Sequence, residues 1–164
     1  MNMNDNINSV SFSEVALTKN RLSQISFYNG YIYMLEHIPC QKKTIAIRFC
    51  SSSGKKESLI SGSYSIGSRV YEYGGGDYVI INDVFYFINL YDQALYGIFL
   101  RKNKQVKRII SKKNERFGGL VGDEKNNKIY CICEKHTSSG VFHKVICIDL
   151  KKNCCTTLCA GKNL

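Results

Sequence analysis

The feature that most constrains the fold of this chain is an internal repeat. Residues 29–33 (NGYIY), 82–86 (NDVFY) and 126–130 (NNKIY) each combine a polar turn with an apolar stretch that ends on tyrosine, at offsets of 53 and 44 residues. A second apolar stretch follows each copy, at residues 44–49, 94–99 and 144–149. Repeats of this length are typical of solenoids, propellers and related arrays. The repeat therefore limits the architecture before any single motif is considered.

Each copy contains four short predicted strands, which is the pattern of a propeller blade. First strands are predicted at residues 22–28, 77–81 and 117–122. Fourth strands are predicted at residues 58–60, 108–110 and 157–159. The second strands are apolar on both faces and rich in β-branched and aromatic residues, as expected for strands sandwiched between neighbouring blades. We predict an all-β fold with about three four-stranded antiparallel blades of an incomplete β-propeller.

The predicted blades take up nearly the whole chain. We place them at about residues 22–61, 70–111 and 117–160, within one partial propeller that covers residues 13–164. Residues 1–12 form a polar N-terminal segment. Closed propellers have about 4 to 8 blades, so three blades leave a blade face and strand edges open. We expect that the chain continues into further blades in the intact protein, or that its open edges pair through self-association.

Composition indicates a folded protein of the cytoplasm. The chain has 11 tyrosines and 8 phenylalanines, a single proline and 44% hydrophobic residues, which excludes disordered and collagen-like classes. Its start has no basic and apolar leader, and no apolar run approaches the roughly 18 residues that span a membrane. We expect neither secretion nor membrane insertion. Without a signal peptide, the eight cysteines are expected to be reduced thiols.

Neither the positive charge nor the cysteines indicate a ligand. The formal net charge of +10 would suit a nucleic-acid binder. However, the basic residues gather in expected hairpin turns, such as residues 55–56 and 151–152, so we interpret them as solvated turns and rank a nucleic-acid partner last. Cys131 and Cys133 lie on one face of an inner strand, which favours core thiols over a zinc site. We expect no metal and no cofactor.

The most specific motif lies between the first two blades. Residues 69–78 read RVYEYGGGDY, which resembles the Arg-Val-His-Glu-Tyr-Gly-Gly-Gly signature of propellers in acylaminoacyl and dipeptidyl peptidases of the prolyl oligopeptidase family. Similarity continues in register at Asn89 with residues 92–96, and at Asp123 with residues 127–136. Two positions depart from the family pattern, because Tyr71 stands in place of the usual histidine and Lys135 in place of the usual acid.

The resemblance implies that the propeller precedes an α/β-hydrolase domain with a Ser-Asp-His triad. The sequence contains no Gly-x-Ser-x-Gly elbow. Without an elbow, His37, His136 and His143 are expected to be turn or strand residues rather than catalytic bases. We predict that this chain is not an enzyme on its own and contains no catalytic residue, whereas the intact parent protein would be a serine peptidase.

In such a parent the propeller shields the hydrolase site and gates the access of peptides. The candidate residues for substrate gating or for the domain interface are Arg69, Glu72, Tyr73, Gly74, Gly75 and Gly76. Glycine permits positive φ and close backbone approach, which suits a crowded site. Alternatively, these residues form a structural corner in which Arg69 and Glu72 pair.

The resemblance names the expected partners as a C-terminal α/β-hydrolase domain, further blades and peptides. Two alternative functions remain. The first is a stand-alone propeller-like module for protein interaction, and the second is a basic nucleic-acid binder.

Overall fold

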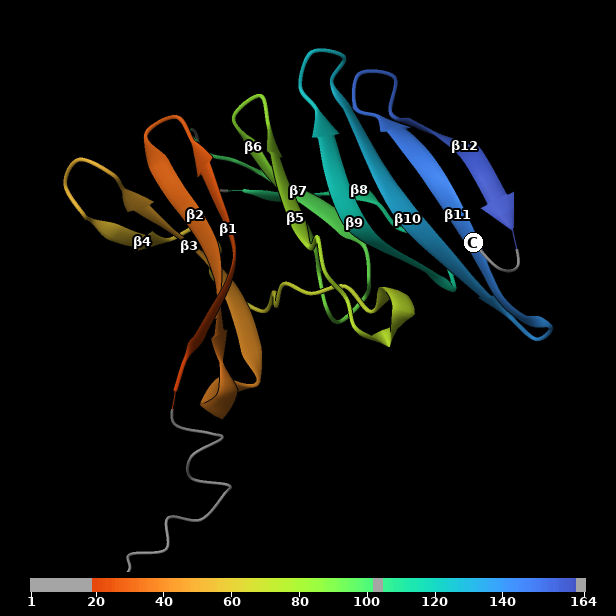
Figure 1. Cartoon of the computed structure of the whole chain (residues 1–164), viewed down its shortest axis with the longest axis horizontal. Helices are drawn as coiled ribbons and strands as arrows, with labels where there is room; N and C mark the ends of the chain where they lie inside the picture. Colours follow the sequence, from red (N-terminus) through yellow and green to blue (C-terminus); the bar gives the residue numbers. More distant parts are fainter. Residues whose placement is uncertain (1–18, 102–104, 162–164) are drawn as a thin grey trace, which may run out of the picture.

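The structure is a computed structural model that describes residues 19–101 and 105–161. In this part of the chain the strands form three four-stranded antiparallel sheets, which stand side by side as blades in Figure 1. Neighbouring strands in each sheet are consecutive in the chain, so every blade is a meander. The predicted all-β fold with three four-stranded blades is confirmed. The predicted N-terminal segment, residues 1–12, lies outside the described residues.

The strands follow the repeat. Blade one consists of β1 (Arg21–Tyr28), β2 (Tyr31–Ile38), β3 (Lys43–Cys50) and β4 (Lys56–Ser58). Blade two consists of β5 (Tyr78–Ile81), β6 (Val84–Ile88), β7 (Leu95–Phe99) and β8 (Val106–Ile110). Blade three consists of β9 (Glu115–Asp123), β10 (Lys128–Thr137), β11 (Gly140–Asp149) and β12 (Cys154–Gly161). Two short 3-10 helices, η1 (Pro39–Gln41) and η2 (Val70–Glu72), lie in connections.

The repeated polar turns close the hairpin between the first and second strand of each blade. Asn29, Asn82 and Asn127 all adopt positive φ, of 47°, 49° and 56°. Asparagine tolerates this region, and the tight two-residue hairpins at Asn29 and Asn82 require it. The connection in blade three is longer and spans residues 124–127. The amide of Asn29 donates to Oδ1 of Asp83 at 3.0 Å, and that of Asn82 donates to Oδ1 of Asn127 at 3.1 Å. The repeated turns therefore also link each blade to the next.

Two apolar cores fill the spaces between blades. The first core lies between blades one and two and includes Tyr33, Phe85 and Phe87. The second core lies between blades two and three and includes Tyr86 and Ile88. Alternate residues of β6 thus enter opposite cores, because successive side chains of a strand point to opposite faces. Burial of each such side chain contributes about 1.5–3 kcal/mol.

The fourth strand of blade one differs from the sequence prediction. It was expected at residues 58–60, but β4 ends at Ser58. Leu59 and Ile60 turn inward instead and are buried in the first core. The amide of Leu59 still donates to the carbonyl of Ala46 at 2.9 Å. Burial of two aliphatic side chains therefore takes the place of continued strand pairing at this edge.

The cysteines belong to the strands and their turns. All eight are free thiols, and Cys131 and Cys133 are buried in the second core. Among the described residues, no group of three or more His, Cys, Asp or Glu side chains is arranged to hold a metal ion. The helices in the described ranges are too short and too polar to cross a bilayer.

Candidate functional site

The motif of residues 69–78 lies in a tight turn of the chain, which we call the glycine corner (residues 68–77). Figure 1 shows η2, part of this corner, at the end of the molecule opposite the asparagine turns. The backbone has positive φ at Tyr71 (54°), Glu72 (60°), Gly74 (69°), Gly75 (116°) and Gly76 (57°). Such values cost free energy for residues other than glycine. Neighbouring elements must therefore hold Tyr71 and Glu72 in place.

Two of the three glycines are required by close packing. A Cβ atom on Gly74 would lie 2.5 Å from the carbonyl oxygen of Ser68. A Cβ atom on Gly76 would lie 2.6 Å from Cα of Gly119 in β9. The amide of Gly119 donates to the carbonyl of Gly75 at 3.0 Å, and that of Leu120 donates to the carbonyl of Gly76 at 2.9 Å. The glycine corner is thus joined by its backbone to β9, the first strand of blade three.

Asp77 connects the same corner to blade one. Its Oδ1 accepts hydrogen bonds from the amides of Ser68 at 2.7 Å and Gly75 at 3.3 Å. Its Oδ2 accepts from Nε2 of Gln24 at 2.5 Å, and its own amide donates to Oε1 of Gln24 at 2.9 Å. Gln24 has φ of 52° and lies where the β1–β2 register shifts. The bulge in β1 therefore directs the side-chain amide of Gln24 toward Asp77, at the start of blade two.

A buried carboxylate in blade three holds η2. Glu134 in β10 is 3% exposed, and its Oε1 accepts the backbone amide of Tyr71 at 2.7 Å. Nε2 of His136 lies 3.2 Å from Oε2, and Nε2 of His143 lies 3.4 Å from Oε1. The Tyr71 ring stacks on the His143 ring, with centroids 5.0 Å apart. Glu134 can therefore stabilise the positive φ of Tyr71 through a charge-assisted hydrogen bond.

A second contact from blade three reaches the outer side of the corner. Nη1 of Arg116 donates to Oε1 of Glu72 at 2.5 Å and to the carbonyl of Arg69 at 3.0 Å. The hydrogen bond and charge of this guanidinium lower the pKa of Glu72. Glu72 thus pairs with Arg116, and no ion pair between Arg69 and Glu72 is present among the described residues. The pairing expected from the sequence is replaced by a contact between blades.

The predicted site residues divide into two groups. Gly74 and Gly76 face the packed interior of the corner, whereas Gly75 is exposed with open space around it, and Arg69, Glu72 and Tyr73 are exposed on its outer side. Tyr73 is 95% exposed. Arginine and tyrosine are enriched in the buried cores of protein interfaces. The exposed group is therefore suited to contact another domain or a peptide, while the glycines fix its position.

Sequence reasoning did not identify several residues that hold the corner. Glu134 and Asp77 lie inside segments that resemble the peptidase propellers, and this was the one signal for them. Gln24 and Arg116 had no signal, because each lies 44 or more residues from its partner in the corner. Their roles depend on how the blades pack and not on local spacing.

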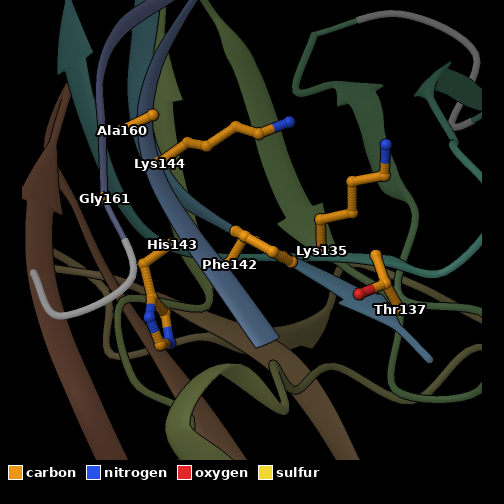
Figure 2. A pocket seen from close by; sticks show the side chains of 7 residues that line it. All are labelled: Lys135, Thr137, Phe142, His143, Lys144, Ala160 and Gly161. Carbon is orange, nitrogen blue, oxygen red and sulfur yellow. The ribbon is translucent and has the colours of Figure 1, made fainter. Parts of the chain in front are cut away.

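A cavity lies beside His143 in blade three. It has a volume of about 480 Å³ and is lined by Lys135, Thr137, Phe142, His143, Lys144, Ala160 and Gly161. Figure 2 shows the imidazole of His143 and the ammonium group of Lys144 extending away from each other. These two residues are neighbours on β11, so they point to opposite faces of the sheet. The imidazole of His143 and the ammonium group of Lys144 therefore do not converge on one point.

Comparison with known proteins shows which solved structures have a similar fold. Neither a protein-family model nor a curated protein sequence matches the chain. Solved structures do match. A puromycin-hydrolysing peptidase from Mycobacterium tuberculosis has a TM-score of 0.80 and 20% identity, over 95% of this chain and 27% of that chain. The three blades of the chain match part of the fold of this peptidase.

Two further structures agree. A puromycin hydrolase has a TM-score of 0.76 and 17% identity, over 89% of this chain and 25% of that chain. An acylaminoacyl peptidase from Pyrococcus horikoshii has a TM-score of 0.62 and 9% identity, over 89% of this chain and 25% of that chain. The resemblance expected from the motif of residues 69–78 is thus confirmed for the propeller fold. The chain spans about a quarter of the length of these peptidases.

Proposed function

We propose that this chain is a non-catalytic propeller portion of a serine peptidase of the prolyl oligopeptidase family. In the intact protein it would shield the hydrolase site and gate the access of peptides. The observation that carries this proposal is the glycine corner, where the most specific motif of the sequence presents Arg69, Glu72 and Tyr73 to solvent. The propeller fold shared with peptidases supports it.

The rigidity of the corner supports a role in contacting a second domain or a peptide. Gln24 of blade one and Glu134 of blade three both bond to the corner. A preorganised surface loses little conformational entropy on binding. The exposed side chains therefore extend from a backbone that is held in one conformation, which a gate with reproducible geometry requires.

A chimera tests the proposal. Residues 19–161 would replace the matching segment of the Mycobacterium tuberculosis puromycin-hydrolysing peptidase, and hydrolysis of puromycin and of peptide amides would be measured. We expect the chimera to retain hydrolysis, and Glu72→Gln with Tyr73→Ala to change KM for peptides about threefold or more. The matched control is Lys55→Gln, in an exposed turn of blade one. A folded chimera whose kinetics respond equally to both sets of changes contradicts the gating role.

A second candidate function is a stand-alone module for protein interaction. The observation in its favour is that the face of blade one turned away from blade two carries exposed apolar residues, with Phe27 68% exposed. Exposed apolar patches mark interaction sites. If the chain binds no hydrolase domain and the chimera has no activity although folded, this alternative is favoured.

A further inference from the structure

A second cavity lies between the outer parts of blades two and three. Its volume is about 390 Å³, within the range of roughly 300–1,000 Å³ that is usual for small-molecule sites. Its lining includes Val84, Tyr86, Gly97, Phe99, Lys107, Leu150 and Lys151. None of these residues belongs to the glycine corner, so this cavity is separate from the candidate site described above.

The strand register explains why the cavity is there. Tyr86, Gly97 and Lys107 are paired across β6, β7 and β8, so all three lie on the face of blade two that is turned toward blade three. Gly97 contributes no side chain to this row. A Cβ atom on Gly97 would lie 3.1 Å from Cε1 of Tyr86, so the tyrosine ring packs over the glycine. The space beyond the ring stays open, and Leu150 of blade three lines its opposite side.

Tyr86 gives the cavity an unused polar group. Its side chain is buried, at 7% exposure, yet no described residue forms a hydrogen bond with its hydroxyl. Burial raises its pKa, so the hydroxyl is protonated and can donate. The one fully buried side-chain nitrogen or oxygen without a partner in the described residues is Nδ1 of His143, so the Tyr86 hydroxyl is accessible from the cavity. An occupant of the cavity with an acceptor group would supply a partner for this hydroxyl.

The charges on the lining have one sign. Lys107 and Lys151 are exposed at the rim, and no aspartate or glutamate lines the cavity. Neither lysine forms an ion pair with a described residue. Val84, Phe99 and Leu150 give the lining an apolar part, and Phe99 is half exposed. The lining thus combines an apolar surface, a free hydroxyl donor and unpaired cations.

We propose that this cavity binds a small organic acid with a flat apolar body. The carboxylate of the ligand accepts a hydrogen bond from the Tyr86 hydroxyl and lies near the ammonium group of Lys107. Its ring packs against Val84 and Phe99 at the edge of the second core. This inference depends on the cavity alone and holds whether or not the chain functions within a peptidase.

The probe for the test is 2-naphthoate, with 2-naphthamide as its uncharged analogue. Calorimetric titration of the full chain is expected to give a dissociation constant of about 1 mM or below for the acid. We expect the amide to bind about tenfold more weakly, because it lacks the charge that Lys107 contacts. Chemical shifts in NMR spectra should change at Gly97 and Leu150 on addition of the acid.

Three variants decide the result. Tyr86→Phe and Lys107→Gln should each weaken binding of 2-naphthoate about threefold to tenfold. Lys55→Gln removes the same charge from a turn of blade one and should leave the affinity unchanged. Circular dichroism and thermal melting check that each variant is folded. Equal affinity of all three variants, or equal binding of the acid and the amide, would overturn the proposal, because the ring would then be bound by exposed apolar faces elsewhere.

Discussion

At the residue scale, the three consecutive glycines of the corner have different roles. Gly74 and Gly76 leave no room for a Cβ atom, because backbone atoms of Ser68 and Gly119 lie within 2.6 Å of where it would be. Gly75 has nothing within 4 Å, although its φ is 116°. The run of glycines therefore combines two positions fixed by packing with one fixed by backbone conformation alone.

Replacement of Gly76 by alanine tests the packing role. Gly76→Ala combines the strain of φ at 57° with a clash against β9. Gly54→Ala is the matched control, because Gly54 has φ of 66° and open space around it. We expect Gly54→Ala to lower the free energy of unfolding by about 1 kcal/mol and Gly76→Ala to lower it by about 2 kcal/mol more, measured by urea denaturation. Equal losses would contradict the clash.

Cys50 is predicted to be the most reactive thiol at pH 7. Hydrogen bonds from the hydroxyls of Ser52 and Ser53 lower its pKa to about 6, whereas burial raises the pKa of Cys133 to about 12. The thiolate is the nucleophile, so alkylation of Cys50 should be fast above pH 6 and slow below it. Mass spectrometry after brief exposure to iodoacetamide shows which cysteines are alkylated first.

The variant that tests this prediction is Ser52→Ala, which removes the hydroxyl 3.2 Å from the Cys50 sulfur. This variant should raise the pKa of the thiol and slow its alkylation at pH 7 several-fold. Cys133 should react after the chain is unfolded and not before. Alkylation of Cys50 at the same rate in both proteins would show that the serine hydroxyls do not stabilise the thiolate.

At the element scale, η2 keeps its shape because blade three holds it. The amide of Tyr71 donates to buried Glu134, and the carbonyl of Arg69 accepts from Arg116. The helix has three residues and contains the positive φ of Tyr71, so local propensity does not maintain it. Its conformation is therefore a property of the contact between blades.

Hydrogen exchange can measure this contact. Glu134→Ala removes the acceptor of the Tyr71 amide, and exchange at Tyr71 should become about tenfold faster or more, while amides in β6 stay protected. Glu72→Ala is the control, because this exposed carboxylate does not accept the Tyr71 amide. If exchange at Tyr71 is equally fast in both variants, the buried carboxylate does not hold the helix.

The strands were largely predictable from the sequence, whereas the contacts that build the corner were not. Repetition of the turns at Asn29, Asn82 and residues 126–127 located the first hairpin of every blade. The second strand of blade three extends past the apolar stretch that ends its repeat copy and runs to Thr137. Its polar end continues because Glu134 pairs with His143 across the sheet, and the sequence alone does not contain that register.

At the scale of the whole molecule, three blades give two filled cores and two open faces. Exposed apolar residues lie on both outer blades, with Phe27 on blade one and Leu158 on blade three. In each filled core, one blade contributes the face turned toward the next blade in the chain, and the next blade contributes the face turned toward the preceding one. Blade one and blade three each have one of these two kinds of face left open. The open faces are therefore complementary in type.

Association through these faces is expected to depend on concentration. Light scattering after gel filtration should show an average mass that rises with protein concentration, since exposed apolar area favours contact between copies. Phe27→Lys and Leu158→Lys should each reduce this rise, because a charge opposes burial of the face. Lys55→Gln serves as the control and should not reduce it. A monomer at every concentration would contradict this expectation.

The alternation of β6 between the two cores has a consequence for how the molecule comes apart. Phe85 and Phe87 belong to one core, and Val84, Tyr86 and Ile88 belong to the other. Loss of this strand would expose both cores at once, so the packing of both outer blades depends on blade two. We expect calorimetry to show a single cooperative transition, and a separate early transition for either outer blade would contradict it.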